Sequence, residues 1–117
     1  MNTYPRTEKL KQKKEITHLF ENGKWKSNGR LRMISYVLSD EEPGKFAVSV
    51  SKRYFKRAVD RNRIKRLMRE CYRLHKDKLH GAFGNHSHCM LFWVSPSKPQ
   101  SYKDVEKNFL KLCTLPK

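Results

Sequence analysis

The amino-acid sequence predicts an α+β domain, and three observations support this fold class. Residues 31–38 and 45–51 are rich in apolar residues over strand length, with an acidic turn containing Pro and Gly between them. Residues 89–95, CMLFWVS, form a nearly continuous apolar run, as an inner strand covered on both faces does. Residues 59–74 carry apolar residues at helical spacing. The 117 residues are expected to form one domain, 1–117, around one core.

The N-terminal part begins with a polar, basic segment, residues 1–12, most of which we expect to stay a mobile arm. A short helix over about residues 13–22 follows. It is predicted because Ile16, Leu19 and Phe20 share one side and a glycine comes next. So short a helix persists only when it docks against the rest of the protein.

The strand at residues 45–51 has two different faces. Every second residue from Phe46 to Val50 is large and apolar, and the residues between them are alanine or serine. Successive strand side chains point to opposite faces, so one face belongs to the core. The other face either carries a closely packed helix or floors a polar groove, and the alternation leaves both open.

The C-terminal part begins with residues 80–88, HGAFGNHSH, which predict a flexible loop before the apolar strand. Ser101 and Asp104 in SYKD are typical of a helix N-terminus. The helix that follows has an apolar stripe of Val105, Phe109 and Leu112. The order helix, strand, strand, helix, strand, helix predicts a two-layer α+β sandwich.

Charge restricts the possible partners. The chain has 27 Lys and Arg against 11 Asp and Glu, a formal net charge of +16 at pH 7. Self-repulsion of this size opposes compaction unless a polyanion neutralises it, so RNA, DNA or an anionic membrane is expected as partner. No apolar stretch is as long as that of a signal peptide or of a membrane-spanning helix. Three separated cysteines indicate core thiols in a reducing compartment, and we expect a soluble cytoplasmic protein.

The predicted helix at residues 59–74 combines a core-facing arc with a basic edge. At roughly 100° per residue, one arc that must face the sheet contains Ile64, Leu67, Met68, Cys71 and Leu74. A separate stripe at four-residue spacing contains Arg61, Lys65, Arg69 and Arg73.

These basic residues lack acidic counterparts. Residues 51–70 contain nine Lys and Arg and two Asp and Glu. A solvated helix face, the plainer interpretation, usually mixes both signs so that i,i+4 pairs form. We therefore expect this helix to meet an external polyanion, and the planar guanidinium of arginine suits phosphate.

Residues 49–70, SVSKRYFKRAVDRNRIKRLMRE, resemble the signature of the bacterial ribonuclease P protein subunit. That pattern runs from a strand-end Ser-Val-Ser-Lys through a short loop into Ala-Val-x-Arg-Asn-Arg-Ile-Lys-Arg. LFENGK after a basic arm and a C-terminal apolar strand with a Pro-containing turn also fit, so the resemblance covers nearly the whole chain. It implies a fold like ribosomal protein S5 domain 2, with about four strands and a left-handed βαβ crossover that the usual handedness rule does not predict.

The resemblance also implies a function. The family's subunit joins a catalytic RNA that removes the 5′ leader of precursor tRNA, and a cleft between the sheet and the first helix holds that leader. The implied RNA-binding residues are Lys52, Arg53, Arg61, Asn62, Arg63, Lys65, Arg66 and Arg69. The implied cleft residues are Phe20, Tyr36 and Ile16, the last standing where the family commonly has a second aromatic. The loop sequence YFKRA is bulkier and more basic than the family's usual Gly-Asn-Ala.

The catalytic centre is expected to lie in the RNA, with no catalytic residue and no metal site on the protein. Magnesium ions held mainly by RNA would perform the hydrolysis, and no organic cofactor is expected. The expected partners are ribonuclease P RNA and precursor tRNA, bound by one protein monomer per RNA. The histidines near Cys89 lack CxxC or HExxH spacing, which favours loop side chains over a zinc site. They are His75, His80, His86 and His88.

Aromatic side chains in a small domain are more often core residues than base-stacking residues. Trp93 lies inside the apolar strand and is predicted to be core, as Phe55 and Tyr102 are by the general rule. Trp25 lies between two lysines, and both roles stay open for it. Both also stay open for Phe20, whose ring can border the core and floor a cleft.

Three other functions remain open from charge and fold class alone. A structural RNA-binding protein, such as a ribosomal one, has the same features, and the Arg-Asn-Arg motif favours ribonuclease P over it. A DNA-binding protein would place the basic helix in a major groove, but the apolar arc of that helix requires sheet contact. A membrane-surface protein would need an exposed apolar face, which the sequence does not indicate.

Overall fold

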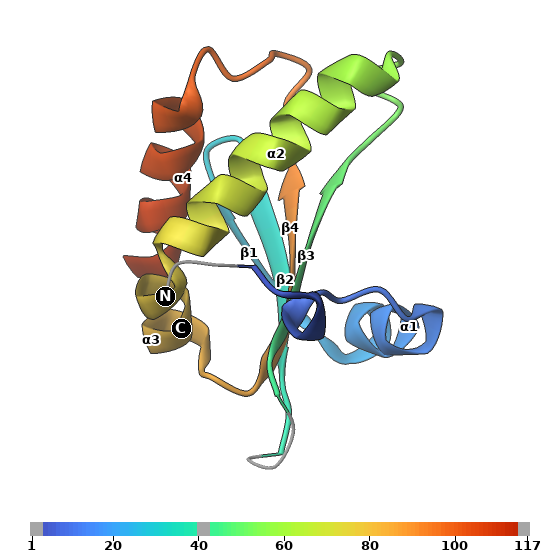
Figure 1. The fold of residues 1–117 in the computed structure, drawn as a ribbon, viewed down its shortest axis with the longest axis vertical. Coiled ribbons are helices and arrows are strands. Elements are labelled where there is room, and N and C mark those ends of the chain that lie inside the picture. The colour runs from blue at the N-terminus through green and yellow to red at the C-terminus, as the bar shows by residue number, and fades with distance from the viewer. Residues whose placement is uncertain (1–3, 40–42, 115–117) are drawn as a thin grey trace.

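The computed structural model describes residues 4–39 and 43–114 and shows a mixed four-stranded sheet with helices on both faces (Figure 1). Its elements are η1 (Arg6–Glu8), α1 (Lys13–Asn22), β1 (Lys24–Asn28), β2 (Leu31–Val37), β3 (Lys45–Val50), α2 (Ala58–Leu74), α3 (Lys76–Phe83), β4 (Ser87–Trp93) and α4 (Tyr102–Thr114). The strand order β1-β2-β4-β3 confirms that the apolar run forms an inner strand. β4 is antiparallel to β2 and parallel to β3. The left-handed sense of the crossover from β3 to β4 stays a prediction.

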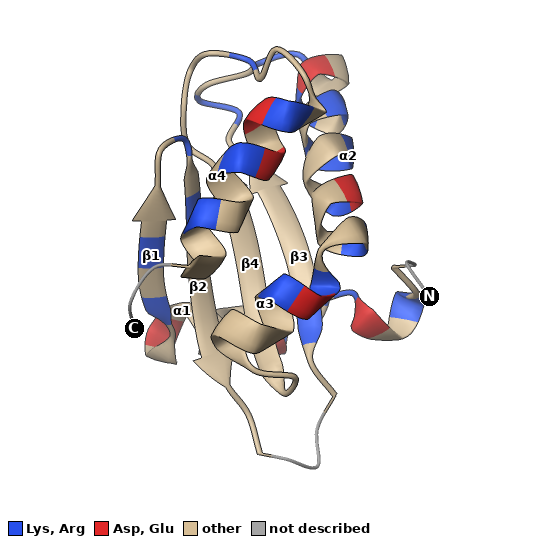
Figure 2. Cartoon of the chain, turned by 90° about the vertical axis from the view of Figure 1, so that its left-hand side faces the viewer, with Lys and Arg blue, Asp and Glu red and all other residues tan. Residues whose placement is uncertain are grey.

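The two faces of the sheet are covered unequally. α2, α3 and α4 lie on one side and α1 lies on the other (Figures 1 and 2). The main core lies between the sheet and the three-helix layer, with Trp93, Phe46 and Phe109 among its largest buried side chains. A smaller cluster of Leu10, Leu19 and Ile34 lies on the α1 side. Docking against it lets a ten-residue helix persist.

α2 buries a slightly different arc from the predicted one. Three of the five predicted residues are fully buried, namely Ile64, Met68 and Cys71. Leu67 is only partly buried and Leu74 is 40% exposed, so the prediction for Leu74 was wrong. Tyr72 is buried in its place because its ring stacks on Phe46, with centroids 4.1 Å apart. This contact turns the buried side of the helix toward Tyr72.

The N-terminal segment differs from the expected mobile arm. The Leu10 amide donates a hydrogen bond to the Phe46 carbonyl at 3.0 Å, and Lys9 forms a β-bridge with Phe46 at the sheet edge. The Tyr4 hydroxyl donates to the same carbonyl, and the Tyr4 ring packs edge-on against Tyr72. Apolar contacts and backbone pairing therefore hold residues 4–10 against β3 and α2. Residues 1–3 of the expected arm lie outside the described residues.

Besides η1, two further elements were not predicted from the sequence. β1 is polar, and it forms because it pairs with β2 along its whole length. α3 extends into the first half of the segment predicted as a loop at residues 80–88. Leu79 is its only buried residue, which is too little to give the sequence an apolar stripe. It ends at Gly84, whose φ of 93° favours glycine. The turn predicted between β2 and β3 includes residues 40–42, which lie outside the described part of the chain.

Candidate nucleic-acid interface

The first two arginines of α2 are held by the protein's own backbone. Arg61 Nη1 donates hydrogen bonds to the carbonyls of Phe55 at 2.7 Å and Lys56 at 2.8 Å. Arg63 Nη1 donates to the Pro99 carbonyl at 3.2 Å. Both arginines are half-buried. They fasten the loops that flank the start of α2, and this reduces what they can offer to an external ligand.

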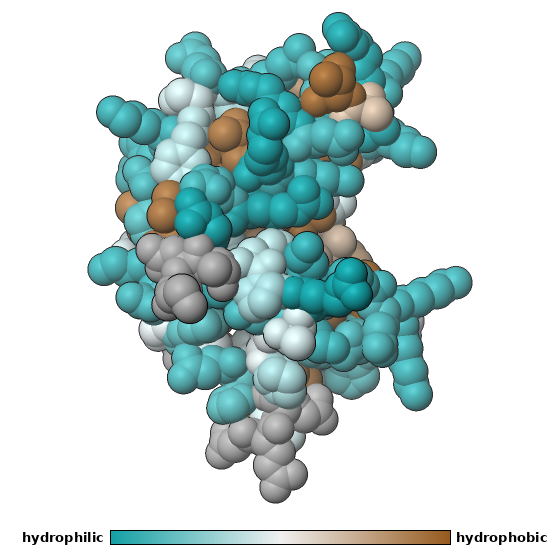
Figure 3. Space-filling model, viewed as in Figure 1, coloured by the Kyte–Doolittle hydropathy of each residue, from teal (hydrophilic) through white to brown (hydrophobic). Residues whose placement is uncertain are grey.

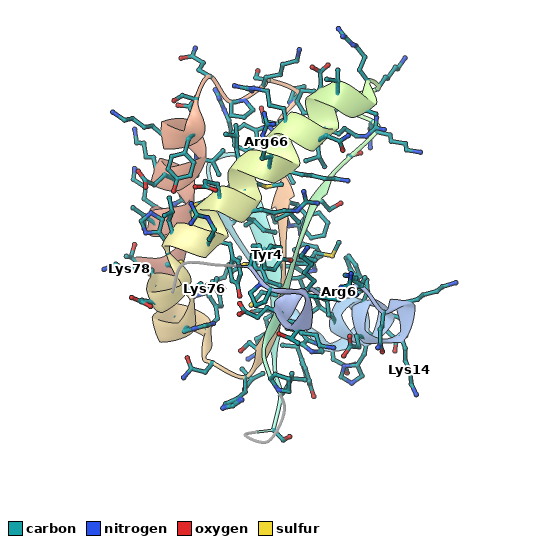
Figure 4. The ribbon with its side chains drawn as sticks, viewed as in Figure 1. Tyr4, Arg6, Lys14, Arg66, Lys76 and Lys78 are labelled. Atoms are coloured by element: carbon teal, nitrogen blue, oxygen red, sulfur yellow. The ribbon has the colours of Figure 1, made fainter. Side chains whose placement is uncertain are left out.

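The middle of α2 carries the cations that are open to a ligand. Lys65, Arg66 and Arg69 make no hydrogen bond or ion pair to a residue in the described ranges, and Arg66 projects from the middle of the helix (Figure 4). The two acids of this region are already engaged. Asp60 lies 3.0 Å from Lys98 Nζ, and the Arg73 guanidinium hydrogen-bonds Glu70, lowering the pKa of that carboxyl.

The other predicted RNA-binding residues surround this helix. Lys52, Arg53 and Asn62 are exposed, on the loop after β3 and on the first turn of α2. The structure thus places the predicted set on the loop after β3 and along α2 from Arg61 to Arg69. It divides the set into two cations fastened to backbone carbonyls and a larger group facing solvent.

An aromatic cluster of Phe20, Trp25 and Phe92 lies on the opposite face of the sheet. The ring centroids of Trp25 and Phe92 are 5.4 Å apart, and each lies 6.0 Å from that of Phe20. The guanidinium carbon of Arg32 lies 4.2 Å from the Trp25 centroid. Phe20 is 46% exposed and Trp25 is 40% exposed. These rings form an apolar surface, bordered by a cation, that solvent reaches.

The turn between α1 and β1 positions this cluster. A Cβ atom at Gly23 would lie 2.6 Å from both Ile34 Cγ1 and the Leu19 carbonyl oxygen, so only glycine fits this close approach without displacing a neighbour. The chain can therefore pass directly from Phe20 at the end of α1 to Trp25 on β1. The strand register then brings Arg32 opposite Phe92 on the neighbouring strands β2 and β4.

The predicted cleft residues Ile16 and Tyr36 lie nearer the other end of α1. The Tyr36 ring packs edge-on against His18, with centroids 4.9 Å apart. Tyr36 lines a hollow of about 480 Å³ together with Lys14, Glu15, His18, Val37, Leu38, Ser39 and His88. Ile16 is partly buried against the Leu10, Leu19 and Ile34 cluster. Phe20 and Tyr36 therefore share a sheet face, and their rings contact different partners.

A small polar network borders the hollow beside Tyr36. Lys45 Nζ lies 2.9 Å from Glu15 Oε2, and His88 Nε2 lies 3.8 Å from the same oxygen. His88 is a buried residue of β4, so it does not belong to the expected loop. Across the described ranges, no group of three or more His, Cys, Asp or Glu side chains could hold a metal ion.

For the strand face that the sequence left open, the structure shows the packed helix at one position, and the polar groove stays a prediction. Ala47 packs in the cluster beneath α1, so part of this face carries a helix. Ser49 lies opposite Phe92, next to the aromatic cluster. Phe55 and Trp93 are buried, as predicted for core aromatics, and Tyr102 is partly buried.

Sequence reasoning missed Arg32 and Phe92 as members of this surface. Phe92 belongs to an apolar run that predicted burial on both faces, but its side chain is only partly buried. A signal for Arg32 was present, because Arg32, Ile34 and Tyr36 alternate on one face of a strand. No helix in the described part of the chain is long and apolar enough to cross a membrane.

Comparison with known proteins identifies the family. A family model described as Ribonuclease P matches residues 4–115. A ribonuclease P protein component from Clostridium botulinum is 34% identical over 105 residues, which are 89% of this chain and 89% of that protein. One from Chlorobaculum tepidum is 41% identical over 83 residues, which are 67% of this chain and 54% of that protein.

Solved structures show the same fold. The ribonuclease P protein from Thermotoga maritima matches with a TM-score of 0.76 and 16% identity, covering 94% of this chain and 99% of that one. A Staphylococcus aureus ribonuclease P protein matches with a TM-score of 0.74 and 19% identity, covering 90% of this chain and 91% of that one. The family model spans nearly all of the sequence, including the Arg-Asn-Arg segment of α2. The chain therefore belongs to the ribonuclease P protein family, the protein components of the enzyme that matures the 5′ ends of tRNAs.

Proposed function

We propose that this chain binds ribonuclease P RNA and the single-stranded 5′ leader of precursor tRNA, while the RNA carries the catalytic centre. The observation that carries the proposal is the presence, in one small protein, of two complementary surfaces. Open cations lie along α2, and exposed aromatic rings with a neighbouring guanidinium lie across the sheet. Phosphates and unstacked bases are the two ligands that these surfaces suit.

The cations of α2 and of the preceding loop bind phosphates of the catalytic RNA in this proposal. Lys65, Arg66 and Arg69 have no competing hydrogen bond or ion pair in the ranges described, so phosphate contact costs no internal interaction. With 6 to 10 phosphate contacts, affinity falls on the order of 10³- to 10⁵-fold between 50 and 200 mM salt. A flat salt response would contradict the electrostatic part of the proposal.

The leader lies along the α1 side of the sheet. Stacking on an aromatic ring is worth about 1–3 kcal/mol per base and is tolerant of sequence, because every base has a π-face. Phe20 and Trp25 offer such rings, and the Tyr36 hollow continues this side past α1. The space-filling surface is hollowed between α1 and the N-terminal end of α2, with hydrophilic residues on both sides and some apolar residues within the hollow (Figure 3). A leader there meets both surfaces.

The protein's own contribution is to bring two polyanions together. Its positive charge lowers the repulsion between catalytic RNA and substrate, and its aromatic surface fixes the leader. Magnesium ions, held mainly by RNA phosphates, supply the activated water. One protein monomer per RNA completes the proposed assembly.

Reconstitution tests this function. Purified protein is mixed with a bacterial ribonuclease P RNA and a precursor tRNA at low magnesium, where neutralisation by the protein matters most. We expect rapid leader release only when RNA and protein are both present, and none from RNA-free protein with magnesium. Cleavage by the protein alone would overturn the assignment of catalysis to RNA. No stimulation of the RNA would overturn the subunit role itself.

A further inference from the structure

A second polar hollow lies at the β1 edge of the sheet, between the β1–β2 turn and α4. Its volume is about 460 Å³. It is lined by Asn28, Gly29, Arg30, Asp104, Lys107, Asn108 and Lys111. Three of these seven residues are cationic and one is acidic, and none belongs to the surfaces assigned above.

The walls of this hollow are fixed by direct contact. Gly29 has φ 56°, and a Cβ atom there would lie 2.0 Å from Asn108 Oδ1, so the turn backbone rests on that side chain. Asn108 Nδ2 donates a hydrogen bond to the Asp104 carbonyl at 2.7 Å. The Arg30 carbonyl accepts one from the Val94 amide at 2.8 Å. The turn and the helix thus form one preorganised surface.

The acids near the hollow are already engaged. Asp104 Oδ2 accepts a hydrogen bond from the Gln100 amide at 2.7 Å, which directs this carboxylate to the start of α4. Glu106 lies 2.8 Å from His75 Nε2, and that hydrogen bond lowers the pKa of its carboxyl.

The cations of the hollow, by contrast, are exposed. Arg30, Lys107 and Lys111 make no ion pair within residues 4–39 and 43–114. Converging cations with amide side chains between them suit a phosphodiester, which takes up positive charge and accepts hydrogen bonds.

The position of the hollow separates it from the loop that leads into α2. β1 and β3 are opposite edges of the four-stranded sheet, three strand spacings of ~4.8 Å apart. The loop with Lys52 and Arg53 follows β3, whereas Arg30 follows β1. Figure 2 shows the basic bands of α4 beside β1, with α2 along the other edge. A phosphate in the hollow therefore belongs to a different stretch of backbone from one at that loop.

We propose that the hollow between the β1–β2 turn and α4 is a second RNA-binding site, which takes phosphate groups of an RNA backbone through Arg30, Lys107 and Lys111. This inference rests on the proposed function as an RNA-binding subunit. With two such sites on opposite edges of its sheet, the protein holds two separate RNA segments at a fixed spacing.

Salt-dependent binding of matched variants tests the site. Lys107→Gln and the double variant Lys107→Gln with Lys111→Gln remove charge from the hollow. Lys78→Gln makes the same change on α3, outside the residues that line the hollow (Figure 4). Arg69→Ala reports on α2. Affinity is measured from 50 to 200 mM salt, first for ribonuclease P RNA alone and then for precursor tRNA binding to the assembled complex, with melting temperatures alongside.

The slope of log affinity against log salt should fall by about one for Lys107→Gln and about two for the double variant, with Lys78→Gln unchanged. A reduced slope in the titration with ribonuclease P RNA assigns the phosphates to the catalytic RNA. A slope reduced only in the titration with precursor tRNA assigns them to precursor tRNA. Normal slopes for both hollow variants, together with a reduced slope for Arg69→Ala, overturn this site and leave the proposed function standing. Normal slopes for all variants contradict both.

Discussion

The hydroxyl of Tyr72 on α2 donates a hydrogen bond to Glu8 Oε1 at 2.6 Å, and this bond fastens the N-terminal segment to the helical layer. Lys76 Nζ lies 2.7 Å from the same oxygen. Burial raises the pKa of Glu8, but the hydrogen bonds from Lys76 and Tyr72 outweigh it and the net pKa is lowered. One carboxylate therefore ties η1 to α2 and to the start of α3.

Glu8→Gln should lower the free energy of unfolding at pH 7 by on the order of 1 kcal/mol, because a charge-assisted hydrogen bond becomes a neutral one. A folded-state pKa below the unfolded value means that the stabilisation is full above the ordinary carboxyl pKa of about 4.3. It disappears as pH falls through the lowered folded value. Thermal melts at pH 7, 5 and 3 should show wild type and variant converging at the lowest pH.

Glu21→Gln on α1 is the matched control for that experiment, since Glu21 is exposed and its substitution changes the net charge equally. It should leave the melting temperature nearly unchanged. If Glu8→Gln lowers the melting temperature as much at pH 3 as at pH 7, packing and not the ionised carboxylate holds the segment.

Arg69→Ala should weaken RNA binding and leave stability within about 0.5 kcal/mol of wild type, as for other exposed sites. It should also reduce the salt slope by about one. Affinity at two salt concentrations, measured beside the melting temperature, checks both. If the variant unfolds, or binds RNA normally, α2 is not the RNA-binding element that we propose.

Arg61→Ala should behave differently. The guanidinium of Arg61 donates hydrogen bonds to the carbonyls of Phe55 and Lys56. Losing hydrogen bonds from a charged group typically costs about 1.5–3 kcal/mol of stability. The melting temperature should therefore fall. A stable Arg61→Ala protein with reduced RNA affinity would place this side chain in the interface after all.

The difference between Arg61 and Arg69 shows which part of the candidate site could be predicted from the sequence and which could not. Helical spacing placed both in one basic stripe, because periodicity depends only on local geometry. Whether a cation faces solvent or a carbonyl depends on the path of residues 51–57, which is a tertiary property. Trp25 is a similar case. Its strand is polar, and it exists through pairing with β2.

The predicted helices show the same limit. α1, α2 and α4 each bury an apolar stripe, and their positions followed from that stripe. α3 buries Leu79 alone and has a glycine within it, so no periodic signal existed. It forms because it packs against α4 and follows α2 almost without interruption.

Met68→Ala should cost roughly 2–5 kcal/mol of stability, the usual range for an emptied core position. Met68 is completely buried between α2 and the sheet, whereas Leu67 is only partly buried. Leu67→Ala should therefore cost less. Urea unfolding of both variants gives the comparison, and equal losses would mean that the buried side of α2 is not the one described.

The cysteines should be poorly reactive in the folded protein. Burial raises the pKa of Cys71 and Cys89 to about 12 and that of Cys113 to about 11, so little thiolate is present at pH 8. Labelling with a chromogenic disulfide reagent should be slow in native buffer, with Cys113 first, and rapid in denaturant. Fast native labelling of Cys71 or Cys89 would indicate that the core opens readily.

Phe20→Ala should weaken binding of the leader specifically. If one base stacks on the aromatic cluster, the expected loss is about 1–3 kcal/mol for precursor tRNA and none for a substrate without a leader. Affinities of the assembled complex for the two substrates give this difference directly. Leu74→Ala is the control, because Leu74 is an exposed apolar residue at the C-terminal end of α2, on the face of the sheet opposite to α1 (Figure 1). Its effect should not depend on the leader. Equal losses of Phe20→Ala for both substrates would remove the aromatic cluster from the leader path and leave Tyr36 and its hollow as the surface to test.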